Sequence, residues 1–217
     1  MAGERRRNPR GEGVALRAQI LEAVEGILNT QTRLQDVNVS LREVARQVGV
    51  TAPSIYLHFV DKNALAWGLV TAGFTSLDET IASAAADEDT TPVDRLTAAA
   101  LAYCLFLENR PGLAGVMFSG DPMRWAPDPG TQHPASLIAR RWEALIGDAM
   151  ADENRSHDDI RAAATSLWSL LHGRTMLSVI YPAGHAPEQL ARFVTATVPA
   201  LLAAPTEQLA AFSAAAT

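Results

Sequence analysis

A short stretch of uncharged polar side chains follows a glycine in the first quarter of the chain. Ile55 and Phe59, four residues apart, would anchor a helix to a core through one face. The groups on its other face could then reach base edges and phosphates, which proteins recognise through hydrogen bonds and apolar contacts. The residues available on that face are Thr51, Ala52, Ser54, Tyr56 and His58.

The surrounding residues predict the two short helices that would position this face. Ser40 to Glu43 matches a capping box, in which each side chain bonds the other residue's backbone amide. Gly49 can end the first helix in the left-handed conformation, and Thr51 can cap the second, whose first turn tolerates Pro53. This pattern is typical of a helix-turn-helix that enters the major groove, and a plain helical hairpin within a bundle is the alternative.

Charge is distributed unevenly along the chain. The whole chain has a net charge of −6, but residues 1–62 hold nine Lys and Arg against seven Asp and Glu, whereas residues 63–217 hold nine against seventeen. Phosphate contact needs local positive charge, and an acidic remainder discourages non-specific binding. The asymmetry favours a nucleic-acid contact at the N-terminal end.

Apolar residues recur at helical spacing and no run alternates as a strand would, so the sequence predicts an all-α fold. Ser119 to Pro134, rich in Pro and Gly, is the longest segment without periodicity and is typical of a functional or mobile loop. We expect Pro199 to bend or end the last helix. The predicted helices are 13–31, one beginning at Ser40, one capped by Thr51, one from Asp61 towards Ile81, Thr91 to about Asn109, Leu113 to Phe118, Ala135 to Met150, Asp158 to Ile180, and Pro187 to Leu202.

Residues 48–65, VGVTAPSIYLHFVDKNAL, resemble the DNA-binding signature of tetracycline-repressor (TetR) family regulators. The match spans the turn, the recognition helix, the Tyr-x-His-Phe element and the Asp-Lys start of the next helix. Residues 40–45, SLREVA, resemble the preceding helix, and the similarity covers roughly residues 14–75. Leu57 departs from the family pattern, which often has a polar or basic residue there, and Asn63 replaces a usual acid.

The resemblance implies a role for individual residues and a domain plan. Bases or adjoining phosphates would be contacted by Thr51, Ala52, Ser54 and Tyr56, and the DNA backbone would be positioned by Ser40, Arg42, Tyr56, His58 and Lys62. For His58, core packing is an equal alternative. The expected plan is a basic tail over 1–12, a DNA-binding domain over 13–75 with its helix-turn-helix at about 40–59, a ligand-binding and dimerisation domain over 76–204, and a tail over 205–217. The tail arginines would either touch DNA or form a solubilising end.

The second half resembles the C-terminal domains of one TetR subgroup. Trp168 to Gly173 matches a Trp-x-x-x-His-Gly element, and residues 105–113 with Met117 and Phe118 are also similar to that subgroup. The resemblance implies a homodimer formed through the last two long helices. Its recognition helices would then lie about 34–36 Å apart, or a multiple of this, on a near-palindromic double-stranded operator.

Apolar and aromatic side chains with few polar groups could line a small-molecule pocket in this half. Plain core packing is the favoured alternative for each of them, except Trp125, which the Pro-rich loop could carry as a lid. The candidate pocket residues are Tyr103, Cys104, Leu107, Met117, Phe118, Trp125, Trp142, Trp168, His172 and Met176.

Other classes of function lack sequence support. We find no phosphate-binding glycine loop, nucleophile elbow or zinc-protease helix, so neither an enzyme nor a cofactor or metal site is expected. Cys104 stands alone, which excludes an internal disulfide and fits a reducing, cytoplasmic location. No apolar run reaches the length of a membrane span. The sequence therefore predicts a ligand-responsive transcriptional regulator, most simply a repressor, with a constitutive or architectural DNA-binding dimer as the alternative.

Overall fold

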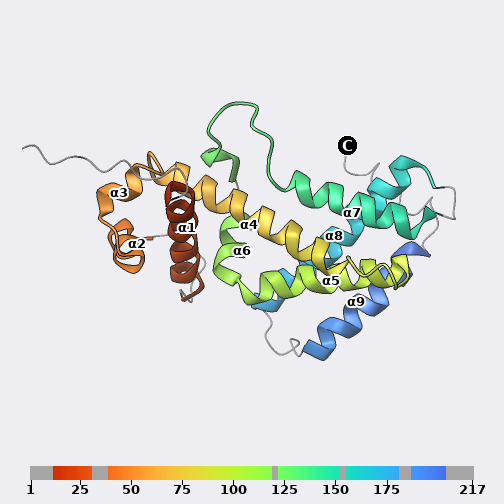
Figure 1. The fold of residues 1–217 in the computed structure, drawn as a ribbon. Coiled ribbons are helices and arrows are strands. Elements are labelled where there is room, and N and C mark those ends of the chain that lie inside the picture. Colours follow the sequence, from red (N-terminus) through yellow and green to blue (C-terminus); the bar gives the residue numbers. More distant parts are fainter. Residues whose placement is uncertain (1–11, 31–38, 119–121, 152–154, 181–186, 204–217) are drawn as a thin grey trace, which may run out of the picture. The chain divides into compact units, whose positions relative to one another are not determined.

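The computed structural model describes residues 12–30, 39–118, 122–151, 155–180 and 187–203. These residues form helices joined by loops and contain no strand, which confirms the all-α prediction (Figure 1). The elements are α1 (Glu12–Thr30), α2 (Leu41–Val48), α3 (Ala52–Tyr56), α4 (Lys62–Ala84), α5 (Pro92–Asn109), α6 (Pro111–Met117), the 3-10 turn η1 (Pro122–Trp125), α7 (Ser136–Ala149), α8 (His157–Ile180) and α9 (Pro187–Leu202).

The chain divides into two compact units. The first consists of residues 1–73 and 110–131, and the second of residues 74–109 and 132–217. Helix α4 begins in the first unit and ends in the second. The α6 segment belongs to the first unit although it follows α5 of the second.

The core of the first unit holds the helix-turn-helix in place. Helix α1 packs on α2, and α2 packs on α3. Ile20, Ile55 and Phe59 are buried there, and the Arg17 guanidinium lies 4.7 Å from the centre of the Phe59 ring. Gly49 adopts φ 76° at the end of α2, as its position in the turn predicts.

Helix α6 packs on α1 through a glycine. A methyl group added to Gly112 would lie 2.4 Å from the Leu28 carbonyl carbon, so only glycine allows this approach. The Gly112 amide donates to Asn29 Oδ1 at 3.0 Å, and Arg110 Nε lies 3.5 Å from Glu25 Oε1. The close approach of the two helix backbones at Gly112, together with these polar contacts, stabilises the packing of α6 on α1.

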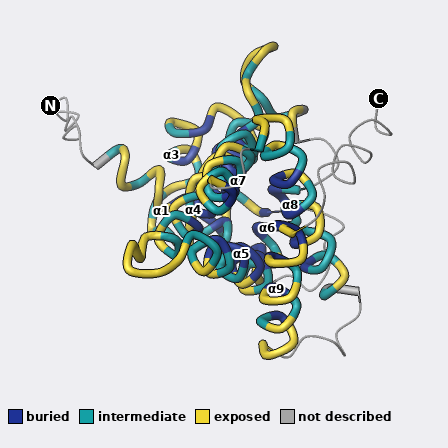
Figure 2. The backbone as a smooth tube through the Cα atoms, turned by 90° about the vertical axis from the view of Figure 1, so that its right-hand side faces the viewer, coloured by how far each residue is buried: buried dark blue, intermediate teal, exposed yellow. Residues whose placement is uncertain are grey.

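The second unit is built around α5, which packs against α7, α8 and α9. Figure 2 shows buried residues along α5 and alternating buried and exposed positions along α9. Arg141 on α7 donates two hydrogen bonds to the Asp78 carboxylate on α4, at 2.9 and 3.0 Å. An apolar core with a bidentate ion pair beside it holds these helices.

Two predicted caps at the helix-turn-helix are wrong in their side-chain contacts. Ser40 is the N-cap of α2 through its backbone carbonyl, but its hydroxyl makes no capping bond. The Glu43 carboxylate accepts from Arg46 instead of reaching back to Ser40, because an opposite charge one turn away is the stronger partner. The Thr51 hydroxyl makes no capping bond either and lies 2.8 Å from Ser54 Oγ.

Helix starts elsewhere agree with their sequence signals. Asp61 Oδ1 accepts from the Ala64 amide at 2.7 Å, and Thr91 Oγ1 accepts from the Asp94 amide at 3.1 Å. Helix α9 does not end at Pro199 but continues to Leu202. The burial of Val198, Leu201 and Leu202 holds this last turn although proline donates no hydrogen bond.

Candidate functional site

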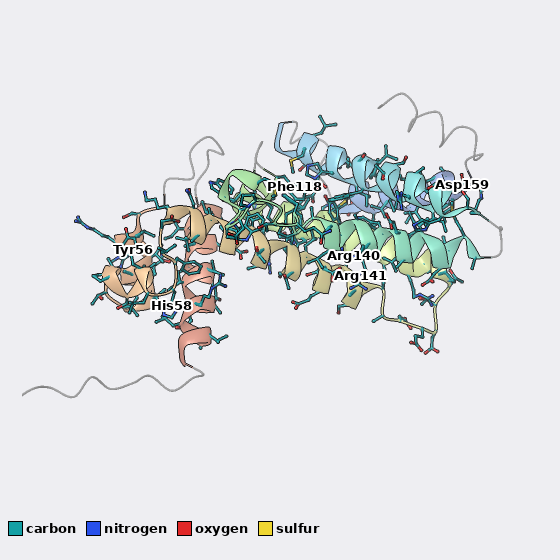
Figure 3. The ribbon with its side chains drawn as sticks, turned by 90° about the horizontal axis from the view of Figure 1, so that it is seen from above. Tyr56, His58, Phe118, Arg140, Arg141 and Asp159 are labelled. Atoms are coloured by element: carbon teal, nitrogen blue, oxygen red, sulfur yellow. The ribbon has the colours of Figure 1, made fainter. Side chains whose placement is uncertain are left out.

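The face predicted to meet DNA lies on α3 and the turn that follows it. Ile55 and Phe59 are buried as the sequence indicates, whereas the Tyr56 side chain is 51% exposed. Figure 3 shows Tyr56 and His58 in this segment. Because the two anchors fix one side of the segment, the opposite side is held in a defined orientation towards solvent.

Small polar groups lie at the start of α3. Thr51 is exposed, and its hydroxyl and that of Ser54 lie 2.8 Å apart, so each orients the other. Ala52 and Ser54 are half-buried. Hydroxyls donate and accept, so this pair can bind either a base edge or a phosphate oxygen.

The positively charged side chains near this face differ in whether they form salt bridges. Arg46 is bound to Glu43, and that hydrogen bond lowers the pKa of Glu43. Arg42 and Lys62 are exposed and take part in no ion pair with the described residues. They are the cations of the predicted set that can meet phosphates without first breaking a salt bridge.

Ser40 and His58 occupy different environments. Ser40 is exposed at the start of α2, where its hydroxyl makes no capping bond. His58 is half-buried, and a methyl group added to Gly13 would lie 3.9 Å from His58 Cε1. His58 therefore faces the start of α1 with part of its ring.

Two apolar residues beside Tyr56 are exposed and were not among the predicted contacts. Leu57 is 85% exposed and Val60 is 78% exposed. The i, i+4 spacing of Ile55 and Phe59 could have identified Leu57, since a residue between two buried anchors faces outward. Thymine methyl groups and sugar carbons are partners for such side chains.

Four of the candidate pocket residues come together in the second unit, from α5, α7 and α8. Trp168 Nε1–H donates to the Tyr103 hydroxyl oxygen at 2.9 Å, and this hydroxyl lies 3.0 Å from His172 Nδ1. The Tyr103 ring packs edge-on against Trp142, with centroids 5.9 Å apart. Residues that are 65 and 69 positions from Tyr103 in the sequence are thus joined to it in one hydrogen-bonded chain.

Burial keeps these groups uncharged. It raises the pKa of Tyr103 above its ordinary value and lowers the pKa of His172. With Trp168 donating to its oxygen, the Tyr103 O–H can donate to His172 Nδ1, which places the imidazole proton on Nε2. The chain therefore runs from Trp168 through Tyr103 to a neutral His172.

The remaining pocket candidates are divided between the units. Cys104, Leu107 and Met117 are buried, while Phe118, Trp125 and Met176 are partly exposed. Met117, Phe118 and Trp125 belong to the first unit, and Cys104, Leu107 and Met176 belong to the second. Burial raises the pKa of Cys104 to about 11, so its thiol stays protonated at neutral pH.

The described ranges contain neither a candidate metal cluster nor a candidate membrane span. Within them, no cluster of three or more His, Cys, Asp or Glu side chains is arranged to hold a metal ion. None of the described helices has the length and apolarity required to cross a membrane.

Comparison with protein families gives two matches. Residues 37–66 match the family described as bacterial regulatory proteins, tetR family. Residues 96–201 match the family described as tetracyclin repressor-like, C-terminal domain. The first match contains the helix-turn-helix, and the second contains Tyr103, Trp142, Trp168 and His172.

Curated relatives match over about half their length. The nucleoid occlusion factor SlmA of Vibrio atlanticus is 31% identical over 117 residues, which are 54% of this chain and 55% of that protein. The factor of the same name from Photobacterium profundum is 30% identical over 117 residues, with the same shares of each chain.

Solved structures share the fold. A candidate transcriptional regulator from Pseudomonas aeruginosa PAO1 has a TM-score of 0.70 at 22% identity, with 92% of this chain and 96% of that chain covered. The transcriptional regulator FadR of Bacillus subtilis, solved with stearoyl-CoA, has a TM-score of 0.65 at 13% identity and coverage of 86% and 97%. NalD of Pseudomonas aeruginosa, the secondary repressor of the MexAB-OprM efflux pump, has a TM-score of 0.58 at 18% identity and coverage of 85% and 96%.

Proposed function

Because this chain belongs to the TetR family of transcriptional regulators and carries its DNA-binding domain, we propose that it is a ligand-responsive repressor. It binds a near-palindromic operator as a homodimer and is released by a small, largely apolar effector. The observation that carries the DNA-binding part is the solvent-facing side of α3, with Tyr56 exposed opposite the buried Ile55 and Phe59.

Specific binding is assigned to the polar groups of this face. Thr51, Ala52, Ser54 and Tyr56 meet bases or adjoining phosphates, and their uncharged character permits close approach to base edges. Ser40, Arg42, His58 and Lys62 position the DNA backbone. Arg42 and Lys62 dominate the salt dependence, since each neutralised phosphate contributes about 0.9 to the slope of log affinity against log salt.

The dimer is assigned to α8 and α9. Leu170 and Leu177 are exposed apolar residues seven positions apart on α8, and so lie on one face two turns apart. Exposed leucines at this spacing are typical of a helix that packs against a second helix. Two-fold pairing would present two α3 helices to successive major grooves on one side of the duplex.

The effector is assigned to the second unit. Tyr103, Trp142, Trp168 and His172 combine aromatic surface with a few oriented polar atoms, which is the usual character of small-molecule sites. FadR, which shares the fold, was solved in complex with stearoyl-CoA, and this supports a small-molecule ligand for the present chain. Helix α4 belongs to both units and would transmit the response. A coupling free energy of ~1–3 kcal/mol is enough to change operator affinity several-fold to about a hundredfold.

A shift assay on the DNA upstream of the protein's own gene tests this proposal. The protein should bind that DNA, and at least one member of a library of small apolar compounds should release it. Binding that no compound alters would leave the second candidate, a DNA-binding dimer without an effector. That candidate is favoured by the similarity to proteins named nucleoid occlusion factors.

A further inference from the structure

Trp142 carries a buried hydrogen-bond donor that lacks an acceptor. The side chain is 0% exposed, and within the described residues its Nε1–H makes no hydrogen bond. Leaving such a group unpaired costs roughly 1–3 kcal/mol, and the great majority of buried polar groups are paired. The unpaired donor is therefore a sign of a missing partner.

The hydroxyl of Tyr103, whose ring packs on Trp142, is already engaged. The Tyr103 ring packs edge-on against Trp142, but its hydroxyl oxygen accepts from Trp168 and lies within hydrogen-bond distance of His172 Nδ1. Trp168, Tyr103 and His172 thus hydrogen-bond to one another, and none of these bonds includes the Trp142 Nε1–H. An acceptor brought in from outside the chain would complete the cluster.

The charges around Trp142 restrict what that acceptor can be. Burial holds Tyr103 and His172 in their neutral forms. The neighbouring cation, Arg141, is occupied by two hydrogen bonds to Asp78. A carboxylate buried without a counter-charge would cost several kcal/mol, whereas a neutral oxygen would not.

We propose that the second unit binds an apolar compound bearing an uncharged carbonyl oxygen, and that this oxygen accepts a hydrogen bond from Trp142 Nε1–H. The proposal rests on the proposed function and specifies the chemical class of its effector. Ile138, four residues before Trp142 on α7, and Leu107, four residues after Tyr103 on α5, are buried apolar residues one turn from these rings. Because Trp142 is inaccessible to solvent, the helices must open for entry, and association is expected to be slower than typical encounter rates.

Three probe compounds of nearly equal size differ in the group that would accept the hydrogen bond from Trp142. Acetophenone has a neutral carbonyl, α-methylstyrene has a methylene group in its place, and benzoate has a carboxylate. Each is titrated into the full chain labelled with ¹⁵N at the indole nitrogens, and the four tryptophan Nε1–H resonances are followed. The resonance that is lost in each Trp→Phe variant, at position 67, 125, 142 or 168, belongs to the substituted residue. If one variant does not fold, its resonance is the one that remains after the other three are assigned.

The proposal predicts that acetophenone moves the Trp142 Nε1–H proton resonance downfield and binds more tightly than the other two probes. Trp142→Phe keeps an aromatic ring but removes the donor, and it should weaken acetophenone binding roughly three- to tenfold. Trp67→Phe, on the part of α4 that belongs to the first unit, is the matched control and should leave binding unchanged.

Three results would overturn the proposal. These are binding of α-methylstyrene as tight as that of acetophenone, tighter binding of benzoate, and a Trp142 resonance that none of the probes moves at millimolar concentration. Operator binding is measured separately. If acetophenone binds at Trp142 without affecting operator affinity, the Trp142 site is supported and the proposal that a ligand regulates operator binding is contradicted. If another compound releases the operator without moving the Trp142 resonance, the proposal of a ligand-responsive regulator is supported and the Trp142 site is contradicted.

Discussion

The two candidate sites of this molecule are built in opposite ways. The α3 face comes from one contiguous stretch, Thr51 to Val60, and presents its groups to solvent around two buried anchors. The Tyr103 cluster draws on three helices and lies largely inside its unit. A surface that must fit a duplex needs exposed groups on a rigid support, whereas a site for a small apolar molecule needs buried surface with few polar atoms.

This difference has an energetic consequence. Polar groups on the α3 face are solvated before they bind, so their removal should affect DNA affinity more than folding. Polar groups in the Tyr103 cluster are desolvated already, so their removal leaves unpaired partners and should affect folding first. The substitutions below separate these effects.

The largest expected effect concerns the support of the first site. Gly112→Ala should lower the free energy of unfolding by about 2–3 kcal/mol, because its new methyl group would meet the Leu28 backbone at 2.4 Å. Gly26→Ala on α1 is the matched control, since nothing lies within 4 Å of its added methyl group. Urea denaturation followed by circular dichroism measures both, and equal stability of the two variants would show that α6 does not need this close contact.

Tyr103→Phe tests the buried chain. Loss of the hydroxyl leaves the Trp168 N–H and His172 Nδ1 without their common partner, so we expect a loss of about 2 kcal/mol. Trp168→Phe removes one member of the same chain, and the double variant should lose less than the sum of the two. Additive losses in thermal unfolding would mean that the three groups do not act as a unit.

Lys62→Ala and Leu57→Ala separate charge from apolar contact on the α3 face. Loss of Lys62 should reduce the slope of log affinity against log salt by about 0.9, whereas loss of the 85% exposed Leu57 should weaken binding without changing the slope. Arg140→Ala, an exposed position on α7, serves as the control for charge outside the site. A salt titration by fluorescence anisotropy gives the slopes, and the same slope for wild type and Lys62→Ala would remove Lys62 from the interface.

The smallest effect expected is a pH dependence from His172. Burial lowers its pKa in the folded state below the ordinary 6.5, so the unfolded state binds the proton more readily. Stability is then full above pH 6.5 and falls as the pH is lowered towards the folded-state pKa. His172→Asn should reduce the acid loss of Tm, and His157→Asn at the exposed start of α8 is the control. If both variants lose Tm on acidification as the wild type does, burial of His172 is not a source of the pH dependence.

The sequence predicted the elements better than the contacts between them. Helical spacing and the caps at Asp61 and Thr91 indicate where helices begin because these signals are local. The preference of Glu43 for Arg46 over Ser40 depends on a competition between two nearby partners, which a four-residue pattern does not resolve. The close contact of Gly112 with α1 joins residues more than eighty positions apart and leaves no local sign.

The same limit applies to the two sites. The α3 face was predicted because all its residues share one helix and turn, although the exposure of Leu57 and Val60 was overlooked. In the second half, Trp168 and His172 share a helix face and could be paired from spacing alone. Their common partner Tyr103, and the unpaired donor of Trp142 beside it, depend on how α5, α7 and α8 pack.

The most direct test of the central claim compares operator and unrelated DNA at one fixed salt concentration, with wild type and Tyr56→Ala. If the exposed side of α3 reads the operator, Tyr56→Ala should weaken operator binding about ten- to a hundredfold and leave binding to unrelated DNA nearly unchanged. A Tyr56→Ala protein that folds normally and keeps the wild-type ratio of the two affinities would contradict the account.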